Sequence, residues 1–263
     1  MLASDPPPLT PGDTLPVPGL DGIYVLSVKS FADRIAHIRR ELGAQRLDFE
    51  FVFDHDAAEL EPTVLARQFP PDTQLSRAHC SLVLKHAEAW RRALSRGQRT
   101  ILVLEDDVLL NRNFRAGLAT ALAAGRELRD GWLIFLGGAD TKVPDAFFLS
   151  ETPLFPLPLP TAEGYLTDAA AMARRVAWLD ANQADLPADH LINQIDEACG
   201  IPQYWLRSPV VEQGSVFGLF TSKLDRNRLK HSTVYNWLRY HWNKIRRRRL
   251  RGCWVKLRAR LGG

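Results

Sequence analysis

The sequence has few cysteines, no long apolar run, and no basic-then-apolar pattern near its start. Its three cysteines (Cys80, Cys199 and Cys253) are an odd number and form no CxxC pair, which argues against a disulfide framework or a zinc site and fits a reducing compartment. No stretch approaches the roughly 18 apolar residues that a membrane span needs. The first twenty residues hold six prolines but no signal-peptide pattern, so we expect a disordered lead-in over 1–20 and a cytoplasmic protein.

Positive charge is scarce in most of the chain and concentrated at its end. The net charge is +4, from 34 Lys and Arg against 30 Asp and Glu. From Arg226 onward there are thirteen basic residues and no acidic one, which leaves a net charge of −9 for residues 1–225. We therefore divide the chain into an acidic body over 21–225 and a basic tail over 226–263.

The basic tail carries apolar residues at helical spacing. Two such series are Val234, Leu238, Trp242 and Ile245, and then Leu250, Trp254, Leu257 and Leu261. A basic amphipathic helix with aromatics is typical of an element that docks on anionic lipid. On this interpretation the tail lies on the inner face of the cytoplasmic membrane, docked by Trp237, Trp242, Arg246, Arg247, Arg248 and Arg249. A helix packed on the body and a nucleic-acid-binding tail are the alternatives, although the acidic body argues against nucleic acid.

Apolar runs alternate with helical patterns through the body. We expect strands at 23–28, 49–53, 100–104, 132–136 and 203–206, and helices at 31–42, 76–95, 113–124, 168–180 and 187–198. This order predicts an α/β domain with an open, mostly parallel Rossmann-type sheet and flanking helices. Prolines interrupt residues 142–160, where we expect a hairpin or loop excursion.

Three adjacent carboxylates (Glu105, Asp106 and Asp107) end the apolar run at 100–104. Ligands of parallel sheets bind just beyond the carboxyl ends of the strands. Three acids placed there repel one another unless a cation, an arginine or a lysine offsets them. One solution is Mn²⁺ or Mg²⁺ completed by substrate phosphates. The other is a helix at 108–110 capped by Asp106 or Asp107, and the triplet alone leaves both open.

Several segments stand in an order that resembles glycosyltransferase family 25, which includes lipopolysaccharide and lipooligosaccharide β-galactosyltransferases. The resemblance covers 22–224 and rests on Asp33-Arg34, Phe51-Val52-Phe53-Asp54, Lys85-His86-Ala87-Glu88-Ala89-Trp90, Leu104-Glu105-Asp106-Asp107-Val108, Gly164-Tyr165-Leu166, Leu186-Pro187-Ala188-Asp189 and Pro209-Val210-Val211-Glu212-Gln213. The chain departs from the family pattern at His79, Ser81, Leu82 and Lys85. Contacts that the family makes from those four positions are therefore not carried over.

The resemblance implies a GT-A fold, a nucleotide-sugar donor and a divalent metal, usually Mn²⁺. Asp107 would ligate the metal, and Glu105 would reach the metal, a metal-bound water or the ribose. Asp189 would be the general base that deprotonates the acceptor hydroxyl in an inverting transfer, with a helix N-cap as its alternative role.

Four further residues complete the predicted donor site. Asp106 belongs to the same acidic motif, and Arg34 would pair with the diphosphate or the uracil edge. Asp54, or Asp56 close to it, would accept hydrogen bonds from the nucleotide, and His86 would line the site or bond within the fold. A surface arginine and turn capping are the alternatives for Arg34 and the aspartates.

These observations together predict a metal-dependent hexosyltransferase. The donor would be a UDP-hexose, UDP-galactose in particular, and the acceptor a lipopolysaccharide-type or lipid-linked glycan. A metal-dependent phosphoryl-transfer or nucleotide-cleaving enzyme is the alternative that uses the same acids, although the chain has no Walker-type glycine-rich loop. A nucleic-acid-binding protein acting through the basic tail is the second alternative.

Overall fold

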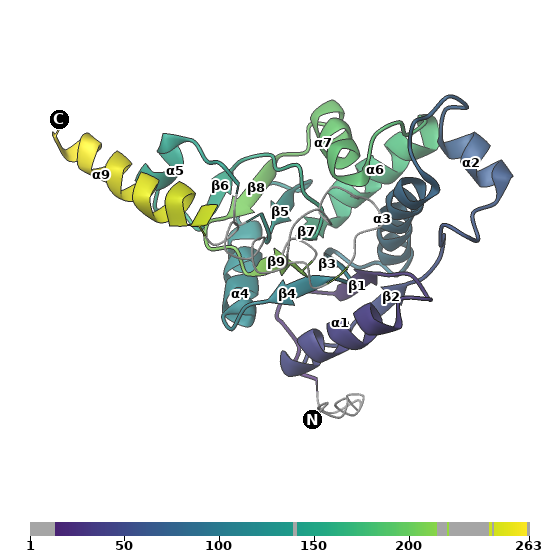
Figure 1. The fold of residues 1–263 in the computed structure, drawn as a ribbon, viewed down its shortest axis with the longest axis horizontal. Coiled ribbons are helices and arrows are strands. Elements are labelled where there is room, and N and C mark those ends of the chain that lie inside the picture. The colour runs from purple at the N-terminus through teal and green to yellow at the C-terminus, as the bar shows by residue number, and fades with distance from the viewer. Residues whose placement is uncertain (1–13, 139–140, 215–219, 221–241, 244, 262–263) are drawn as a thin grey trace.

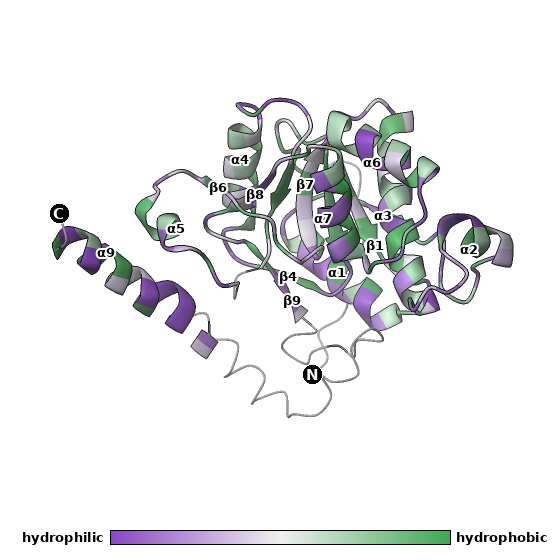
Figure 2. Ribbon diagram, turned by 90° about the horizontal axis from the view of Figure 1, so that it is seen from above, coloured by the Kyte–Doolittle hydropathy of each residue, from purple (hydrophilic) through white to green (hydrophobic). Residues whose placement is uncertain are grey.

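The computed structural model describes residues 14–138, 141–214, 220, 242–243 and 245–261. They form a body built on one central sheet with helices on both faces, from which the C-terminal helix projects as an arm (Figures 1 and 2). The predicted α/β class with a mostly parallel, helix-flanked sheet is confirmed.

The central sheet has seven strands in the order β2-β1-β3-β7-β5-β8-β6. Their bounds are β1 Gly22–Leu26, β2 Glu50–Val52, β3 Thr100–Glu105, β5 Leu133–Phe135, β6 Leu154–Pro156, β7 Gly164–Asp168 and β8 Gln203–Leu206. Strand β1 pairs in parallel with β2 and β3, and β5 pairs in parallel with β8. Only β7 and β6 run against the others in this sheet. The carboxyl ends of β1, β2 and β3 therefore meet at one edge.

Helices cover both faces of the sheet, which explains the continuous apolar run of β3. Along this strand Leu102 and Leu104 pack in one core cluster, with α1 (Ala32–Ala44) and α4 (Phe114–Gly125). Ile101 and Val103 pack in the other, with α3 (Arg77–Ser95), α6 (Ala169–Ala181) and α7 (Ala188–Ala198). Successive strand residues point to opposite faces, so a strand covered on both sides must be apolar at each position. The five helices predicted from the sequence correspond to these five.

Residues 164–168 form β7, a central antiparallel strand, which is absent from the strands predicted by the sequence analysis. The pattern is hard to recognise because β7 has five residues and α6 begins directly after it. The Asp168 carboxylate ends the strand and caps the helix, because it accepts hydrogen bonds from the backbone N–H groups of Gly131, Trp132 and Ala171. No Gly or Pro separates the strand from the helix, so the sequence gives no turn signal between them.

The proline-rich stretch contains regular elements. It holds a short helix, α5 (Asp145–Leu149), and the strand β6 at the sheet edge. Proline has no backbone N–H to donate to a neighbouring strand. Pro156 is tolerated in β6 because one side of an edge strand has no neighbour that needs this hydrogen bond. The expected loop excursion is thus partly an edge strand. One more short helix, α2 (Pro62–Gln68), was not predicted.

Residues 108–110 form a strand, β4 (Val108–Leu110), which pairs antiparallel with β9 (Val211–Gln213). Asp106 and Asp107 lie in the turn between β3 and β4. The capping alternative is therefore excluded, because no helix follows them.

The described part of the tail is helical, with a π-helix (η3) at Ile245–Leu250 followed by α9 at Arg251–Leu261. Its inner side packs on the body. The Arg248 guanidinium lies 4.0 Å from the centre of the buried Trp205 ring, Arg251 bonds Asp145 at 2.7 Å, and Val255 is buried. The predicted docking residue Trp237 lies outside the described residues. Within the described part, no helix has the length and apolarity to cross a bilayer.

Candidate active site

A cavity of about 330 Å³ opens beside the carboxyl ends of β1 and β3. The loop after β1 (residues 27–31), the loop after β2 (residues 56–59), one face of α3, and the acids 105–107 line it. Ligands of α/β sheets bind at this kind of edge. The cavity therefore lies where the sequence predicted the site.

Asp106 is the structural member of the acidic triplet. Its buried carboxylate accepts a hydrogen bond from the Ser27 hydroxyl at 2.7 Å and another from Arg34 Nη1 at 2.8 Å. Ser27 follows β1 and Arg34 lies in the first turns of α1, so Asp106 joins both segments to the β3–β4 turn. Both of its oxygens are engaged, which fixes the position of its two neighbours in the triplet.

Arg34 pairs with the acids themselves. Its Nη1 also lies 3.7 Å from Asp107 Oδ2, and its guanidinium stacks over the Phe31 and Phe220 rings. The aromatic rings hold the guanidinium at the cavity wall. Arg34 thus offsets part of the negative charge of the triplet.

A fourth carboxylate, Glu163, faces the triplet from the residue before β7. The Glu163 carbonyl accepts the N–H of Glu105 at 3.0 Å, and its side chain is buried and accepts the N–H of Gly138 at 2.8 Å. Burial, and then the charges of Asp107, Glu163 and Asp106, raise the pKa of Glu105 well above its usual range, with Arg34 opposing them. A raised pKa means that Glu105 keeps its proton more readily unless a further positive charge offsets the acids around it, which makes the site attractive to a cation.

The acids fit a divalent metal that is completed by substrate. Glu105 and Asp107 offer the hard oxygen donors that Mn²⁺ and Mg²⁺ prefer. Among the described residues, no three Asp, Glu, His or Cys side chains converge closely enough to hold an ion by themselves. Mg²⁺ commonly binds through one or two carboxylates and takes its other ligands from water and substrate phosphates. This donor set suits an ion bound together with a diphosphate.

His86 lies in the core, outside the cavity lining. The Tyr165 hydroxyl lies 2.9 Å from His86 Nδ1 and 3.0 Å from Trp90 Nε1. Because an indole N–H only donates, Trp90 donates to this hydroxyl, which in turn hydrogen-bonds the His86 ring. Burial, and then the charge of Arg175, lower the pKa of His86 to about 3. His86 is thus a neutral hydrogen-bonding residue of the fold.

The two aspartates after β2 differ in their surroundings. Asp54 is half exposed, its carboxylate pairs with Arg92 on α3, and it does not line the cavity. Asp56 lines the cavity and is buried, with Oδ1 accepting a bond from Lys85 Nζ at 2.7 Å. Of the two predicted aspartates, the structure thus brings Asp56 and not Asp54 to the cavity.

Asp189 lies in the first turn of α7, whose N-cap is Pro187. Its Oδ1 accepts the N–H of His190, so it does not cap the helix from the N-cap position. Strand β7 ends at the edge of the sheet opposite to the triplet, and α6 runs back from there. Helix α7 therefore begins at the same edge as the triplet and leads to β8. Asp189 is half-buried there and outside the lining of the cavity.

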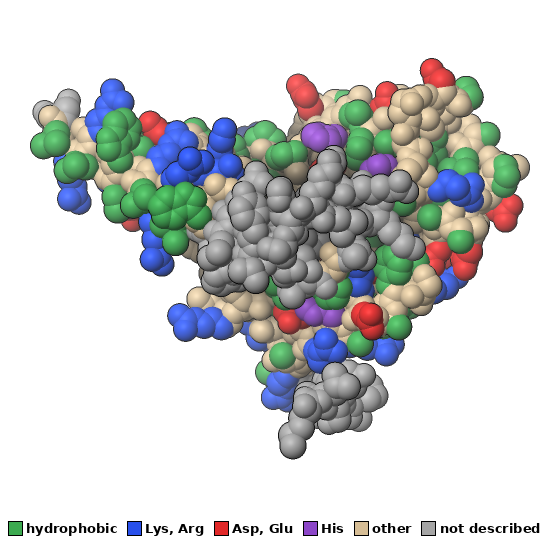
Figure 3. All heavy atoms as spheres, viewed as in Figure 1, with side chains coloured by type: hydrophobic (Ala, Val, Ile, Leu, Met, Phe, Trp, Pro, Cys, Tyr) green, Lys and Arg blue, Asp and Glu red, His purple; other side chains and the backbone are tan. Residues whose placement is uncertain are grey.

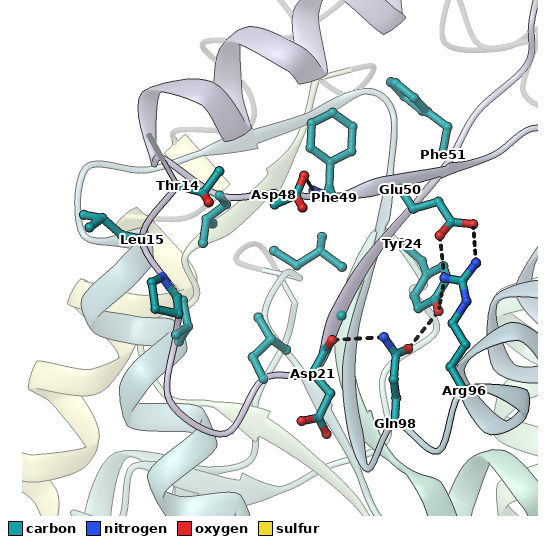
Figure 4. Close-up of a pocket in the computed structure, with 16 residues that line it drawn as sticks. Thr14, Leu15, Asp21, Tyr24, Asp48, Phe49, Glu50, Phe51, Arg96 and Gln98 are labelled. Carbon is teal, nitrogen blue, oxygen red and sulfur yellow. Dashed lines mark hydrogen bonds and ion pairs between the residues drawn. The ribbon is translucent and has the colours of Figure 1, made fainter. Parts of the chain in front are cut away.

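A larger cavity, of about 730 Å³, lies at the amino-terminal end of β1 and β2 (Figure 4). Four of its polar side chains are already bonded in pairs: Tyr24 donates to Gln98 at 2.8 Å, and Arg96 pairs with Glu50. It lies at the edge opposite to the acids. We therefore place the active site at the carboxyl edge.

Sequence comparison finds similarity over the part of the chain that carries the acidic turn. Residues 20–140, which include β1, α1, α3 and the acidic turn, match the family model "Glycosyltransferase family 25 (LPS biosynthesis protein)". A lacto-N-neotetraose biosynthesis glycosyltransferase, LgtE of Neisseria meningitidis serogroup B, is 28% identical over 220 residues, 76% of each chain. The lipooligosaccharide biosynthesis protein lic2B of Haemophilus influenzae is 33% identical over 93 residues, 34% of this chain and 35% of its own.

A third relative, the lacto-N-neotetraose biosynthesis glycosyltransferase LgtB of Neisseria meningitidis serogroup A, is 31% identical over 118 residues, 42% of this chain and 37% of its own. The chain thus spans only about a third of the length of lic2B and LgtB, but three quarters of LgtE. The α/β fold and its acidic edge agree with these matches, which make the chain similar to glycosyltransferases over part of its length. The chain is similar to glycosyltransferase family 25 over residues 20–140.

Ser27 and Glu163 were not singled out as contacts of the acidic site by the sequence. Ser27 is the polar residue that follows a buried strand. Because ligands of parallel sheets bind beyond the carboxyl ends of the strands, its position could have indicated the site. Glu163 gives no such signal, because it precedes a strand that was not predicted.

Proposed function

We propose that this protein is a glycosyltransferase that moves galactose from UDP-galactose onto a lipopolysaccharide-type glycan, with Mn²⁺ or Mg²⁺ and with inversion at the sugar. One observation carries the proposal: four buried or half-buried carboxylates gather at the carboxyl edge of the sheet, beside a cavity between the loops after β1 and β2. The charge of a nucleoside diphosphate is repelled by such acids unless a cation lies between them.

The three acids of the triplet divide two tasks in this proposal. Ser27 and Arg34 hold Asp106 and thereby fix the turn, while Glu105 and Asp107 hold the ion. A bound divalent ion would offset the diphosphate charge and stabilise the departing nucleoside diphosphate. The cavity beside the triplet would take the nucleoside.

Two considerations support the acceptor side. The matched relatives carry names of lipooligosaccharide and lacto-N-neotetraose biosynthesis, which favours a hydroxyl of such a glycan as the acceptor. Asp189 at the same edge is the carboxylate that we assign as general base, since a hydroxyl becomes acidic only as its new bond forms.

Product analysis tests this function. Purified protein incubated with UDP-galactose, Mn²⁺ and a soluble lactosyl- or glucosyl-terminated oligosaccharide should yield an acceptor extended by one hexose, detected by mass spectrometry. Release of UDP or UMP with no extended acceptor, across a panel of such oligosaccharides, would contradict the proposal and favour a nucleotide-cleaving enzyme.

We also propose that the arm docks on an anionic membrane surface. Its outer side exposes more than half of the Leu250, Trp254, Leu257 and Leu261 side chains, next to exposed Arg and Lys residues (Figure 3). The four predicted docking arginines differ in exposure. Arg246 and Arg249 are exposed, whereas Arg247 and Arg248 are half-buried. Arg248 serves the attachment of the arm, so the lipid-facing charge comes from the other residues.

A double substitution on the outer side of α9, Trp254→Ser with Leu257→Ser, should weaken binding to vesicles of phosphatidylglycerol and phosphatidylcholine by about tenfold or more. Each large apolar side chain contributes about 1.5–3 kcal/mol when it is fully buried, and these two would enter the interface. Co-sedimentation measures the binding. Leu15→Ser, an exposed leucine on the body, is the matched control. Unchanged sedimentation of the double variant would refute the docking proposal.

A further inference from the structure

A stripe of polar side chains on α3 holds the loop after β2. Arg77, Ser81 and Lys85 are spaced four residues apart and therefore share one side of the helix. Arg77 donates to the carbonyls of Ala57 and Leu60 at 2.9 and 2.6 Å. Ser81 donates to the carbonyl of His55 at 2.6 Å. This loop is one wall of the cavity, so α3 sets the position of that wall.

Lys85 is the charged member of the stripe, and it is buried with 2% of its surface exposed. Its ammonium donates to the carbonyls of Val52 and Asp54, at 3.3 and 2.7 Å, and to Asp56 Oδ1 at 2.7 Å. An ammonium has three donors, and here each has an acceptor. Burial lowers the pKa of Lys85, while the hydrogen bond and charge of Asp56 act in the opposite direction.

Asp56 extends this contact across the cavity. Its Oδ2 accepts the backbone N–H of Lys29 at 3.0 Å, and Lys29 belongs to the loop after β1, the second wall of the cavity. Lys85, Asp56 and the Lys29 N–H thus form one bridge that joins α3 to both loops. We call these three groups the Lys85 bridge.

The loop needs such support because His55 adopts a positive φ of 61°. Residues other than glycine hold that conformation only where neighbouring contacts enforce it. Here the two contacts are Ser81 on the His55 carbonyl and Lys85 on the Asp54 carbonyl.

We infer that Lys85 is a positioning residue for the donor site: through the Lys85 bridge it fixes both walls of the cavity that receives the nucleoside half of the donor. This inference rests on the proposed function. Asp56 lines the same cavity as the acids 105–107, yet the bridge engages both of its oxygens. It therefore shapes the cavity, and the metal stays with Glu105 and Asp107.

Calorimetric titration of UDP with Mn²⁺ into the full chain tests the inference. In Lys85→Met we expect the Kd of UDP and the KM of the donor to rise about tenfold or more, because displacement of a binding element by about 1 Å can cost up to about a hundredfold. The kcat at saturating donor should change by less than about threefold, since Lys85 touches no reacting group. Asp56→Asn should raise the Kd in the same direction, and the double variant should be no weaker than the worse single one, because both act through one bridge.

Ser81→Ala provides a variant that folds, since it removes only one hydrogen bond to the loop, and it should raise the Kd about threefold. Arg91→Ala breaks an ion pair of α3 with Asp180 away from the cavity and should leave the Kd unchanged. A lower Tm with an unchanged Kd in both Lys85→Met and Ser81→Ala would overturn the inference. Failure of the wild type to bind UDP would instead overturn the proposed function, and the inference with it.

Discussion

Replacing Asp107 with alanine should reduce the rate of glycosyl transfer by at least about a hundredfold. Removal of a residue that merely hydrogen-bonds to a metal ligand can already lower activity by up to about a hundredfold. Asp107 is buried in the turn after β3, where Ser27 and Arg34 hold its neighbour Asp106 in place. The substitution leaves these contacts intact and removes one of the two carboxylates assigned to the ion. The loss should therefore reflect metal and donor binding rather than unfolding.

Initial rates of hexose transfer at several Mn²⁺ concentrations measure this effect. Wild-type activity should disappear with EDTA and return with Mn²⁺, whereas the variant should remain inactive at each concentration. Asp180→Ala is the control. It removes an exposed carboxylate of α6, which forms an ion pair with Arg91 of α3. Wild-type rates in Asp107→Ala would show that the triplet serves another purpose.

Asp189→Asn should lower kcat about a thousandfold, within the range of about 10²–10⁴ that general-base catalysis contributes. The amide keeps the size of the side chain and can still accept the N–H of His190, but it cannot take a proton from the acceptor. Because Asp189 lies outside the donor cavity, the Kd of UDP should not change. The measurement is a pair of KM and kcat determinations with donor and acceptor varied in turn.

Asp185→Asn is the matched control, since Asp185 is an exposed aspartate in the segment leading to α7. Retention of the wild-type kcat in Asp189→Asn would remove Asp189 from the mechanism. Glu163, the fourth carboxylate of the acidic cluster, would then be the next residue to test.

The sequence predicted the parts of the fold in which local pattern and tertiary structure agree. Strand β3 is apolar at each position because both its faces are buried, and the acids end it at the edge where ligands bind. Helix α3 was visible because Ser76 caps it and apolar residues recur along one side. Such features depend on neighbours in the chain, so a single sequence reveals them.

What the sequence did not predict depends on partners far away in the chain. Strand β7 is short and has no turn residues at its end, and only its pairing with β3 and β5 defines it. Glu163 becomes part of the site solely through that pairing. Arg248 belonged to a run of four arginines, and nothing local distinguishes the one that stacks on Trp205. The role of Lys85 likewise required the loop that it contacts.

The most direct test of this account is calorimetric titration of UDP-galactose, among a panel of nucleotide sugars, into the purified full chain with and without Mn²⁺. The account predicts binding at one site for one UDP-sugar, present with the metal and lost without it. A folded protein that binds no nucleotide sugar, or binds one equally well without a divalent ion, would contradict the assignment of Glu105 and Asp107 as the metal-holding residues of a donor site.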